Sequence, residues 1–270
     1  MPLWGGLFYA LVPSARRAVE ANLGRVLAGA PRAEVRRHAR RLFVHYAQSL
    51  TDMYAFHLGR QVPIEVEFHG REAVERVVQG GRGAVTVTGH LGAWQVMPFL
   101  IGRRGELPPM TMAMAEEPNA RVGEFEAQFR ARQRIVYTTQ SPFSLIELSN
   151  RLRRGELVGM QLDRRVGGAE AVLPFFGAPA RFPLGAATLA RSTGCPIVPL
   201  FSLYADRRRR TVRVMYEAPI EVERTRDRAA DLARATARLV EVYERYVRAY
   251  PDQWFNFYDF WDPPGTARPA

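Results

Sequence analysis

The chain has 270 residues, of which 47% are hydrophobic and 24% are charged, so it can bury a core and is not a disordered protein. All of its 38 basic residues are arginine, and its net charge is +11. The single cysteine excludes an internal disulfide and any metal site built from several cysteines. Because guanidinium groups pair with phosphate and carboxylate, this charge favours an anionic partner, although a genomic bias toward arginine would give the same composition.

The N-terminal part of the chain is expected to be helical. Residues 14–58 show two helical patterns that separate near Pro31. No apolar run reaches the roughly 20 residues that span a bilayer, and the short apolar start lacks the leading basic region of a signal peptide. Trp4, Phe8 and Tyr9 in this start fit either a membrane interface or an ordinary buried helix.

From residue 64 onward, short apolar strands alternate with helical patterns. The expected strands are 64–68, 83–89, 110–114, 134–137, 156–162, 197–204 and 211–222, and the expected helices are 71–80, 92–103, 119–132, 141–154, 184–193 and 226–249. This alternation predicts an α/β fold with a largely parallel central sheet flanked by helices and a helical N-terminal lead-in.

The chain is expected to comprise three parts. These are a helical N-terminal segment that is a candidate for membrane-surface contact (1–60), an α/β domain (61–262) and a flexible tail (263–270). In open α/β sheets, ligands bind beyond the carboxyl ends of the strands. His90 lies at such an end, directly after the strand expected at 83–89.

A histidine at this place suits a general base, because its pKa of about 6.5 lets it accept a proton at neutral pH. Such a base needs an acceptor on its other ring nitrogen to fix the tautomer, and Gln95, five residues further on, is the side chain expected to supply it. Backbone N–H groups near Gly92, or an arginine, are expected to hold an oxyanion. Taken alone the spacing is weak evidence, because a histidine beside an apolar segment is more often a core residue.

Several blocks of the sequence follow the order found in one protein family. "TGHLGAWQ" at 88–95 resembles the catalytic block of the lipid A biosynthesis acyltransferases, in which a strand leads into His-Leu-Gly-Asn-Trp-Glu. "GELVGMQLDRRVGG" at 155–168 resembles the family's Asp-Gln-Arg segment, and the stretch at 172–201 resembles its Phe-Phe-Gly turn and the helix that follows. "YPDQWFNFYDFW" at 250–261 and "EANLGRVLAG" at 20–29 resemble its ending and its early Asn-Leu segment.

The resemblance implies a glycerolipid acyltransferase-like fold and an enzyme that transfers an acyl group from an acyl carrier protein or coenzyme A thioester. The acceptor would be a hydroxyl of a lipid or glycolipid, of the lipid A or phospholipid kind. No metal, redox cofactor or nucleic acid is expected. The protein would be peripheral or monotopic on the membrane surface, at the cytoplasmic face of the inner membrane, and its charge would suit an acidic carrier protein.

The resemblance also implies roles for particular residues. His90 is the expected general base, Gln95 its orienter, and Asp163 a residue that organises the site. The residues expected to contact substrate are Gly92, Trp94, Glu116, Glu117, Arg130, Arg132, Arg164 and Arg165.

Departures from the family pattern occur at three positions. Glu116 and Glu117 stand where relatives carry a basic segment, and Gln95 stands where they carry Glu or Asp. Three explanations of Gln95 stay open, because an amide accepts a hydrogen bond without carrying a charge. Another carboxylate, such as Glu116, Glu117 or Asp163, supplies the charge; the acceptor is an easier nucleophile; or the chain is a catalytically impaired protein that binds acyl donors or lipids.

Overall fold

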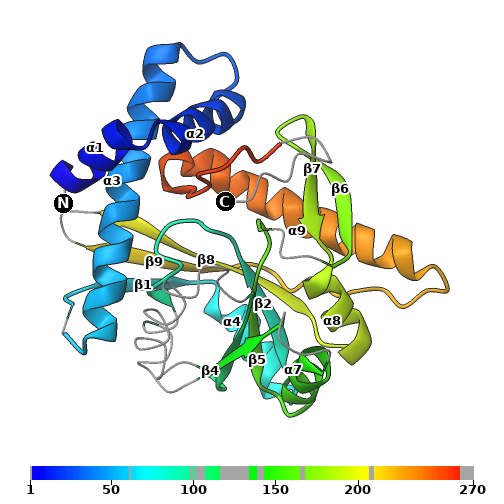
Figure 1. The fold of residues 1–270 in the computed structure, drawn as a ribbon. Helices are drawn as coiled ribbons and strands as arrows, with labels where there is room; N and C mark the ends of the chain where they lie inside the picture. The colour runs from blue at the N-terminus through cyan, green and yellow to red at the C-terminus, as the bar shows by residue number, and fades with distance from the viewer. Residues whose placement is uncertain are drawn as a thin grey trace.

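The computed structural model describes residues 2–60, 62–97, 100, 107–115, 134–138, 143–164, 168–206 and 210–261, with the side chains of residues 2 and 3 excepted. A seven-stranded sheet with the order β1-β9-β8-β2-β5-β3-β4 forms its centre (Figure 1). Its pairs are parallel except for β8 and β9, which are antiparallel. The expectation of a largely parallel sheet flanked by helices is therefore confirmed.

The strands are short and the helices vary widely in length. The sheet strands are β1 (Glu65–His69), β2 (Ala84–Thr88), β3 (Met110–Met114), β4 (Arg134–Tyr137), β5 (Leu157–Gln161), β8 (Ile197–Asp206) and β9 (Thr211–Tyr216). The helices are α1 (Pro2–Leu11), α2 (Pro13–Val26), α3 (Arg32–His57), α4 (Arg71–Gln79), α7 (Ser144–Arg153), α8 (Gly185–Thr193) and α9 (Arg228–Ala249), followed by the 3-10 turn η2 (Pro251–Gln253).

A separate hairpin of β6 (Glu170–Phe175) and β7 (Ala178–Pro183) lies beside α9 (Figure 1). Its two-residue turn consists of Phe176 and Gly177, both with positive φ, as hairpin turns of this length require. The Phe-Phe-Gly turn expected from the sequence is present, but the strands on either side of it were not expected.

The central strands are buried on both faces, as is usual for parallel sheets covered by helices. In β2, Val85 and Val87 belong to the core beneath α7, α8 and α9, whereas Ala84 belongs to the core on the opposite face. This alternation fixes the register of β2, because a slip of one residue would exchange its two faces.

The segment after β2 differs from the prediction. Residues 92–103 were expected to form a helix, but Ala93–Val96 form turns. Met97 and Leu100 have helical geometry, and the remaining residues up to 103 lie outside the described part of the chain. The whole of the expected helix 119–132 and of the expected tail 263–270 lies outside the described residues.

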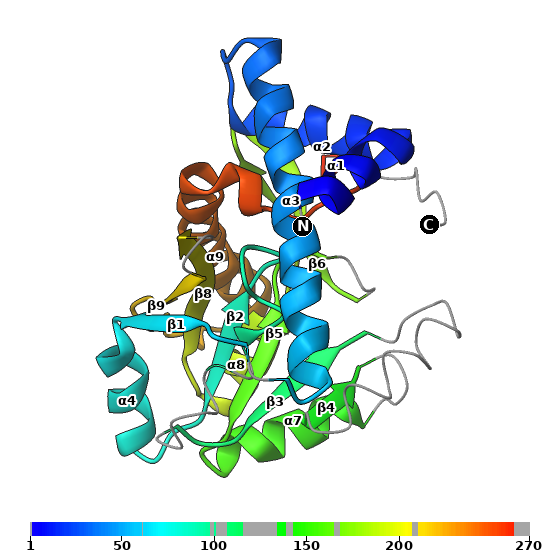
Figure 2. The same ribbon diagram turned by 90° about the vertical axis from the view of Figure 1, so that its left-hand side faces the viewer.

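The helices α1, α2 and α3 share a core, which includes several aromatic rings, with the C-terminal segment, residues 250–261. Phe43 of α3 contacts the rings of Phe8, Tyr9 and Phe257, with ring centroids 5.1–5.4 Å apart. Figure 2 shows α3 running alongside the sheet, with α1 and α2 packed against the upper part of α3. Asn22 of α2 adds hydrogen bonds from its side-chain amide to the carbonyl oxygens of Asn256 and Tyr258.

Helix α1 has one buried and one exposed apolar side. Tyr9 is buried and Phe8 half-buried, whereas Trp4 is 69% exposed and is joined on the outer side by Leu7 and Leu11. The buried-helix alternative holds for Phe8 and Tyr9, whereas Trp4 faces solvent. Contact of this segment with a membrane interface stays a prediction. No helix in the described part of the chain is long and apolar enough to cross a membrane.

Replacement of Phe43 by Ala should lower the free energy of unfolding by about 3–5 kcal/mol, because the ring is fully buried and its loss leaves a cavity. Phe143→Ala is the control, since Phe143 is 70% exposed and its loss should change stability little. Urea unfolding followed by circular dichroism measures both. Equal effects of the two substitutions would contradict this packing.

Candidate active site

The register of β2 and β5 brings His90 and Asp163 together. Thr88 and Gln161 are paired at the carboxyl ends of the two parallel strands. His90 follows Thr88 by two residues, and Asp163 follows Gln161 by two residues. His90 Nδ1 lies 2.7 Å from Asp163 Oδ1, and the two side chains are only 5% and 0% exposed. The two side chains therefore meet beyond the carboxyl ends of β2 and β5, where the sequence analysis placed His90.

The second carboxylate oxygen of Asp163 accepts three hydrogen bonds. The donors are the backbone N–H of His90 at 2.9 Å, the hydroxyl of Tyr243 at 2.5 Å and the amide of Asn256 at 3.1 Å. The Tyr258 hydroxyl donates to the backbone carbonyl of Asp163 at 2.6 Å. A buried carboxylate is stable only when it is satisfied in this way.

The environment shifts the pKa of both partners downward. Burial lowers the pKa of His90 below its ordinary value of 6.5, and this outweighs the attraction of Asp163 for the imidazolium. Burial alone would raise the pKa of Asp163, but His90 and Tyr243 together hold it well below its usual range. At neutral pH the site therefore holds a neutral imidazole that donates Nδ1–H to a carboxylate, and Nε2 is its basic nitrogen.

The loop that carries His90 is fixed by other parts of the chain. Gly92 has φ +64°, and a Cβ there would collide with the carbonyl oxygen of Ser202. The N–H of Gly92 donates to the carbonyl of Gln253 at 2.9 Å, and that of Ala93 donates to Ser202 at 2.7 Å. The expectation that backbone N–H groups near Gly92 bind an oxyanion is therefore wrong in this structure, because both groups already have acceptors.

Trp94 lies directly beside the base. Its ring packs edge-to-face on His90, with centroids 4.6 Å apart. Its Nε1–H is buried and makes no hydrogen bond with any described residue. Such an unsatisfied donor calls for an explanation, and a ligand atom is one.

Gln95 does not contact the ring nitrogen of His90 that it was expected to orient. The Nδ1 of His90 lies against Asp163, while Oε1 of Gln95 accepts a hydrogen bond of 3.0 Å from Ser49 of α3. The prediction relied on a helix beginning near Leu91, but the chain turns at Ala93–Val96 instead.

The other predicted residues fall into two groups. Arg164 is exposed, directly after Asp163, and its charge contributes to the lowered pKa of His90. Glu116, Glu117, Arg130, Arg132 and Arg165 lie outside the described residues. Within the part of the chain that is described, no group of three His, Cys, Asp or Glu side chains could hold a metal ion.

Sequence reasoning missed Tyr243, Asn256 and Tyr258. Tyr243 occupies the buried side of α9, where a tyrosine normally indicates packing. Asn256 and Tyr258 lie in the stretch 250–261, which resembled the family's ending but was given no role in the site. The one available signal was the polar Asn256 within the run Trp-Phe-Asn-Phe-Tyr.

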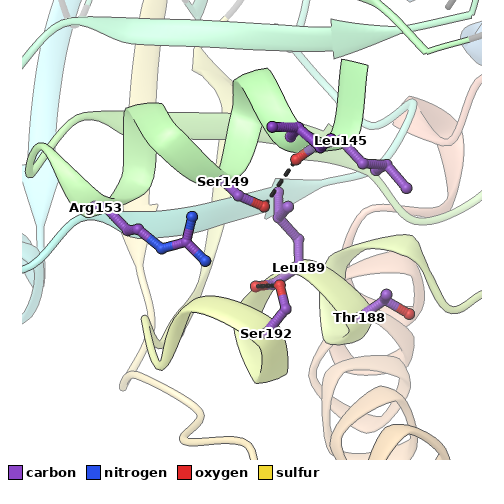
Figure 3. A pocket seen from close by; sticks show the side chains of 7 residues that line it. Leu145, Ser149, Arg153, Thr188, Leu189 and Ser192 are labelled. Atoms are coloured by element: carbon purple, nitrogen blue, oxygen red, sulfur yellow. Dashed lines mark hydrogen bonds between the residues drawn. The ribbon is translucent and has the colours of Figure 1, made fainter. Parts of the chain in front are cut away.

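A separate pocket of about 270 Å³ lies between α7 and α8 (Figure 3). It is lined by Leu145, Ile146, Ser149, Arg153, Thr188, Leu189 and Ser192. It contains neither His90 nor Asp163 nor any of their hydrogen-bond partners.

The described residues thus form a helix-covered α/β sheet with a buried His–Asp pair at its strand ends, and such a pair is able to take up and release a proton. The chain belongs to the bacterial lipid A biosynthesis acyltransferase family, whose model matches residues 4–262. This confirms the family that the sequence blocks indicated.

Relatives of known activity and a solved structure can also be compared. The chain is similar to the phosphatidylinositol mannoside acyltransferases of two Mycobacterium tuberculosis strains, with 24% identity over 200 and 204 residues and 71% of this chain covered. The match spans 58% of the length of those relatives. The crystal structure of the 1-acyl-sn-glycerophosphate acyltransferase PlsC from Thermotoga maritima aligns over 92% of this chain and 97% of that one, with 14% identity and a TM-score of 0.42.

The lowered pKa of His90 makes stability depend on pH. Between that pKa and 6.5 the unfolded chain binds more protons than the folded one, so acidification from pH 7 to about pH 5 should destabilise the protein. His90→Gln should make this dependence shallower, by at most about 1.4 kcal/mol per pH unit. Urea unfolding at a series of pH values measures the slopes, and a steeper slope in the variant would contradict the assignment.

Proposed function

We propose that this protein transfers a fatty acyl group from an acyl carrier protein or coenzyme A thioester to a hydroxyl of a lipid or glycolipid. The observation that carries the proposal is the buried hydrogen bond between His90 and Asp163, which makes Nε2 of His90 the nitrogen that accepts a proton. Family membership supports the type of reaction.

In the proposed reaction, Nε2 of His90 takes the proton of the acceptor hydroxyl while its oxygen attacks the thioester carbonyl. A C–O bond forms, and collapse of the tetrahedral intermediate breaks the C–S bond. The leaving thiolate takes the proton back from the imidazolium. Asp163 stays ionised and stabilises the imidazolium in between.

Trp94 is the proposed donor to the carbonyl oxygen of the thioester. Its Nε1–H is buried beside His90 without a partner among the described residues, whereas the N–H groups of Gly92 and Ala93 are occupied. A donor at the developing oxyanion is worth most in a site from which water is excluded.

A glycolipid or phospholipid acceptor agrees with the comparisons, because the relatives are named for phosphatidylinositol mannoside and the family for lipid A. The proposed setting is the cytoplasmic face of the inner membrane, with peripheral or monotopic association. The exposed apolar side of α1 supports this, as do nine arginines against three acidic residues in 1–60. The positive charge would also suit an acidic carrier protein.

The alternative, a catalytically impaired protein that binds acyl donors or lipids, rested on the uncharged Gln95. Asp163, which lies two residues beyond the end of β5, gives His90 a carboxylate. This favours the enzyme over the binding protein.

Thioester turnover with a membrane lipid extract tests the proposal. His90→Ala should lower turnover by about 10²–10⁴-fold, the usual contribution of a general base. Gln95→Glu should not raise it, because Gln95 contacts Ser49 and not the imidazole. Radiolabelled acyl donor and thin-layer chromatography would follow the product.

Two results would contradict the proposal. Full turnover in His90→Ala would remove the assigned base. Donor binding without turnover in the wild type, together with turnover in Gln95→Glu, would mean that the natural chain is the binding protein.

A further inference from the structure

The carboxylate of Asp163 is held by groups that come from distant parts of the chain. Oδ1 faces His90, while Oδ2 accepts from Tyr243 of α9 and from Asn256 of the C-terminal segment. These two residues lie 80 and 93 positions from Asp163 in the sequence. Since a carboxylate rotates about its Cβ–Cγ bond, donors fixed on Oδ2 determine where Oδ1 points.

The Tyr243 ring is placed independently of its hydroxyl. It stacks on Phe175 and Phe201, with centroids 5.8 and 6.0 Å away and interplanar angles of 8° and 18°. A Cβ on Gly89 would meet the Tyr243 ring, so the glycine beside His90 leaves the space that the ring fills. Phenylalanine would fill the same space, which makes the hydroxyl separable from the packing.

We propose that Tyr243 is a positioning residue whose hydroxyl fixes the Asp163 carboxylate and withdraws charge from it, and so sets how readily His90 takes up a proton. This inference deepens the proposed function, on which it rests for the meaning of His90 as a base. Tyr243 touches no substrate in this account and acts only through Asp163.

The direction of the effect follows from the charges around the pair. Among the described residues, the titratable or charged groups that act on the His90–Asp163 pair are Tyr243, Tyr258 and Arg164, and Asn256 adds a neutral donor. Burial and Asp163 raise the pKa of Tyr243 well above 10, so its hydroxyl remains a donor. Each donor on Oδ2 stabilises the anion and opposes a proton on either partner. Loss of one donor should therefore let the pair take up its proton at a higher pH.

The test is an NMR titration of the His90 ring in the full chain, from about pH 4 to about pH 9, with the signal assigned by its absence in His90→Gln. Tyr243→Phe should raise the midpoint by about 0.5–1 pH unit. Asn256→Ala removes a second donor from the same oxygen and should shift the midpoint in the same direction.

Tyr246→Phe is the matched control. Tyr246 lies one turn further along α9, stacks on the same Phe201 with centroids 4.2 Å apart, and donates to a carboxylate, Glu217, at 2.7 Å. This carboxylate does not contact His90. The control therefore removes an equivalent hydrogen bond and should leave the His90 midpoint at the wild-type value.

An unchanged or lowered midpoint in Tyr243→Phe would overturn the inference, as would an equal rise in Tyr246→Phe. The acid limb of turnover against pH gives a second readout, which should move upward in Tyr243→Phe, whereas a merely structural role would lower turnover at all pH values alike. If Tyr243→Phe shifts the His90 midpoint but turnover does not depend on His90, the proposed function is refuted and the role of Tyr243 stands. If turnover depends on His90 but Tyr243→Phe leaves the midpoint unshifted, the role of Tyr243 is refuted and the proposed function stands.

Discussion

The hydrogen bond between His90 and Asp163 is the interaction on which the site depends. An unpaired carboxylate in the interior costs several kcal/mol, so Asp163 can remain an anion there only because donors surround it. The same donors prevent the carboxylate from rotating away from the ring. Both the stability of the fold and the proposed reaction therefore require an Asp163 carboxylate whose hydrogen bonds are all made, beside a neutral His90 imidazole.

Distant elements of the fold converge on this pair. The C-terminal segment approaches it directly, since the N–H of Phe255 donates to the carbonyl of His90 and Asn256 reaches Asp163. Gln253 anchors the segment to β8 by bonding both backbone groups of Tyr204. The side-chain amide of Asn22 in α2 donates to the carbonyl oxygens of Asn256 and Tyr258 in the same segment. The N-terminal helices therefore support the site through the C-terminal segment, although they contribute no group to the pair itself.

The sequence was sufficient to predict the α/β fold and the location of His90, because a β-branched strand followed by glycine and histidine is a local pattern. Asp163 could also be placed at a strand end, but its contact with His90 depends on β2 and β5 being neighbours in the sheet. The sheet order is a tertiary property. Gln95 was expected to orient His90 because of its spacing in the sequence. In the structure Asp163, which is distant in the sequence, faces the ring nitrogen instead. Tyr243 could not be found at all, since a tyrosine on the buried side of a helix resembles any core residue.

The central claim is that His90 and Asp163 act as one unit. A double-mutant cycle with His90→Ala, Asp163→Asn and the double variant, read as thioester turnover, tests it most directly. Residues that work as a unit show strongly non-additive losses. The double variant should be hardly slower than His90→Ala alone. Losses that multiply in the double variant would show that the two side chains act independently and would contradict the assignment of His90 and Asp163 as one unit.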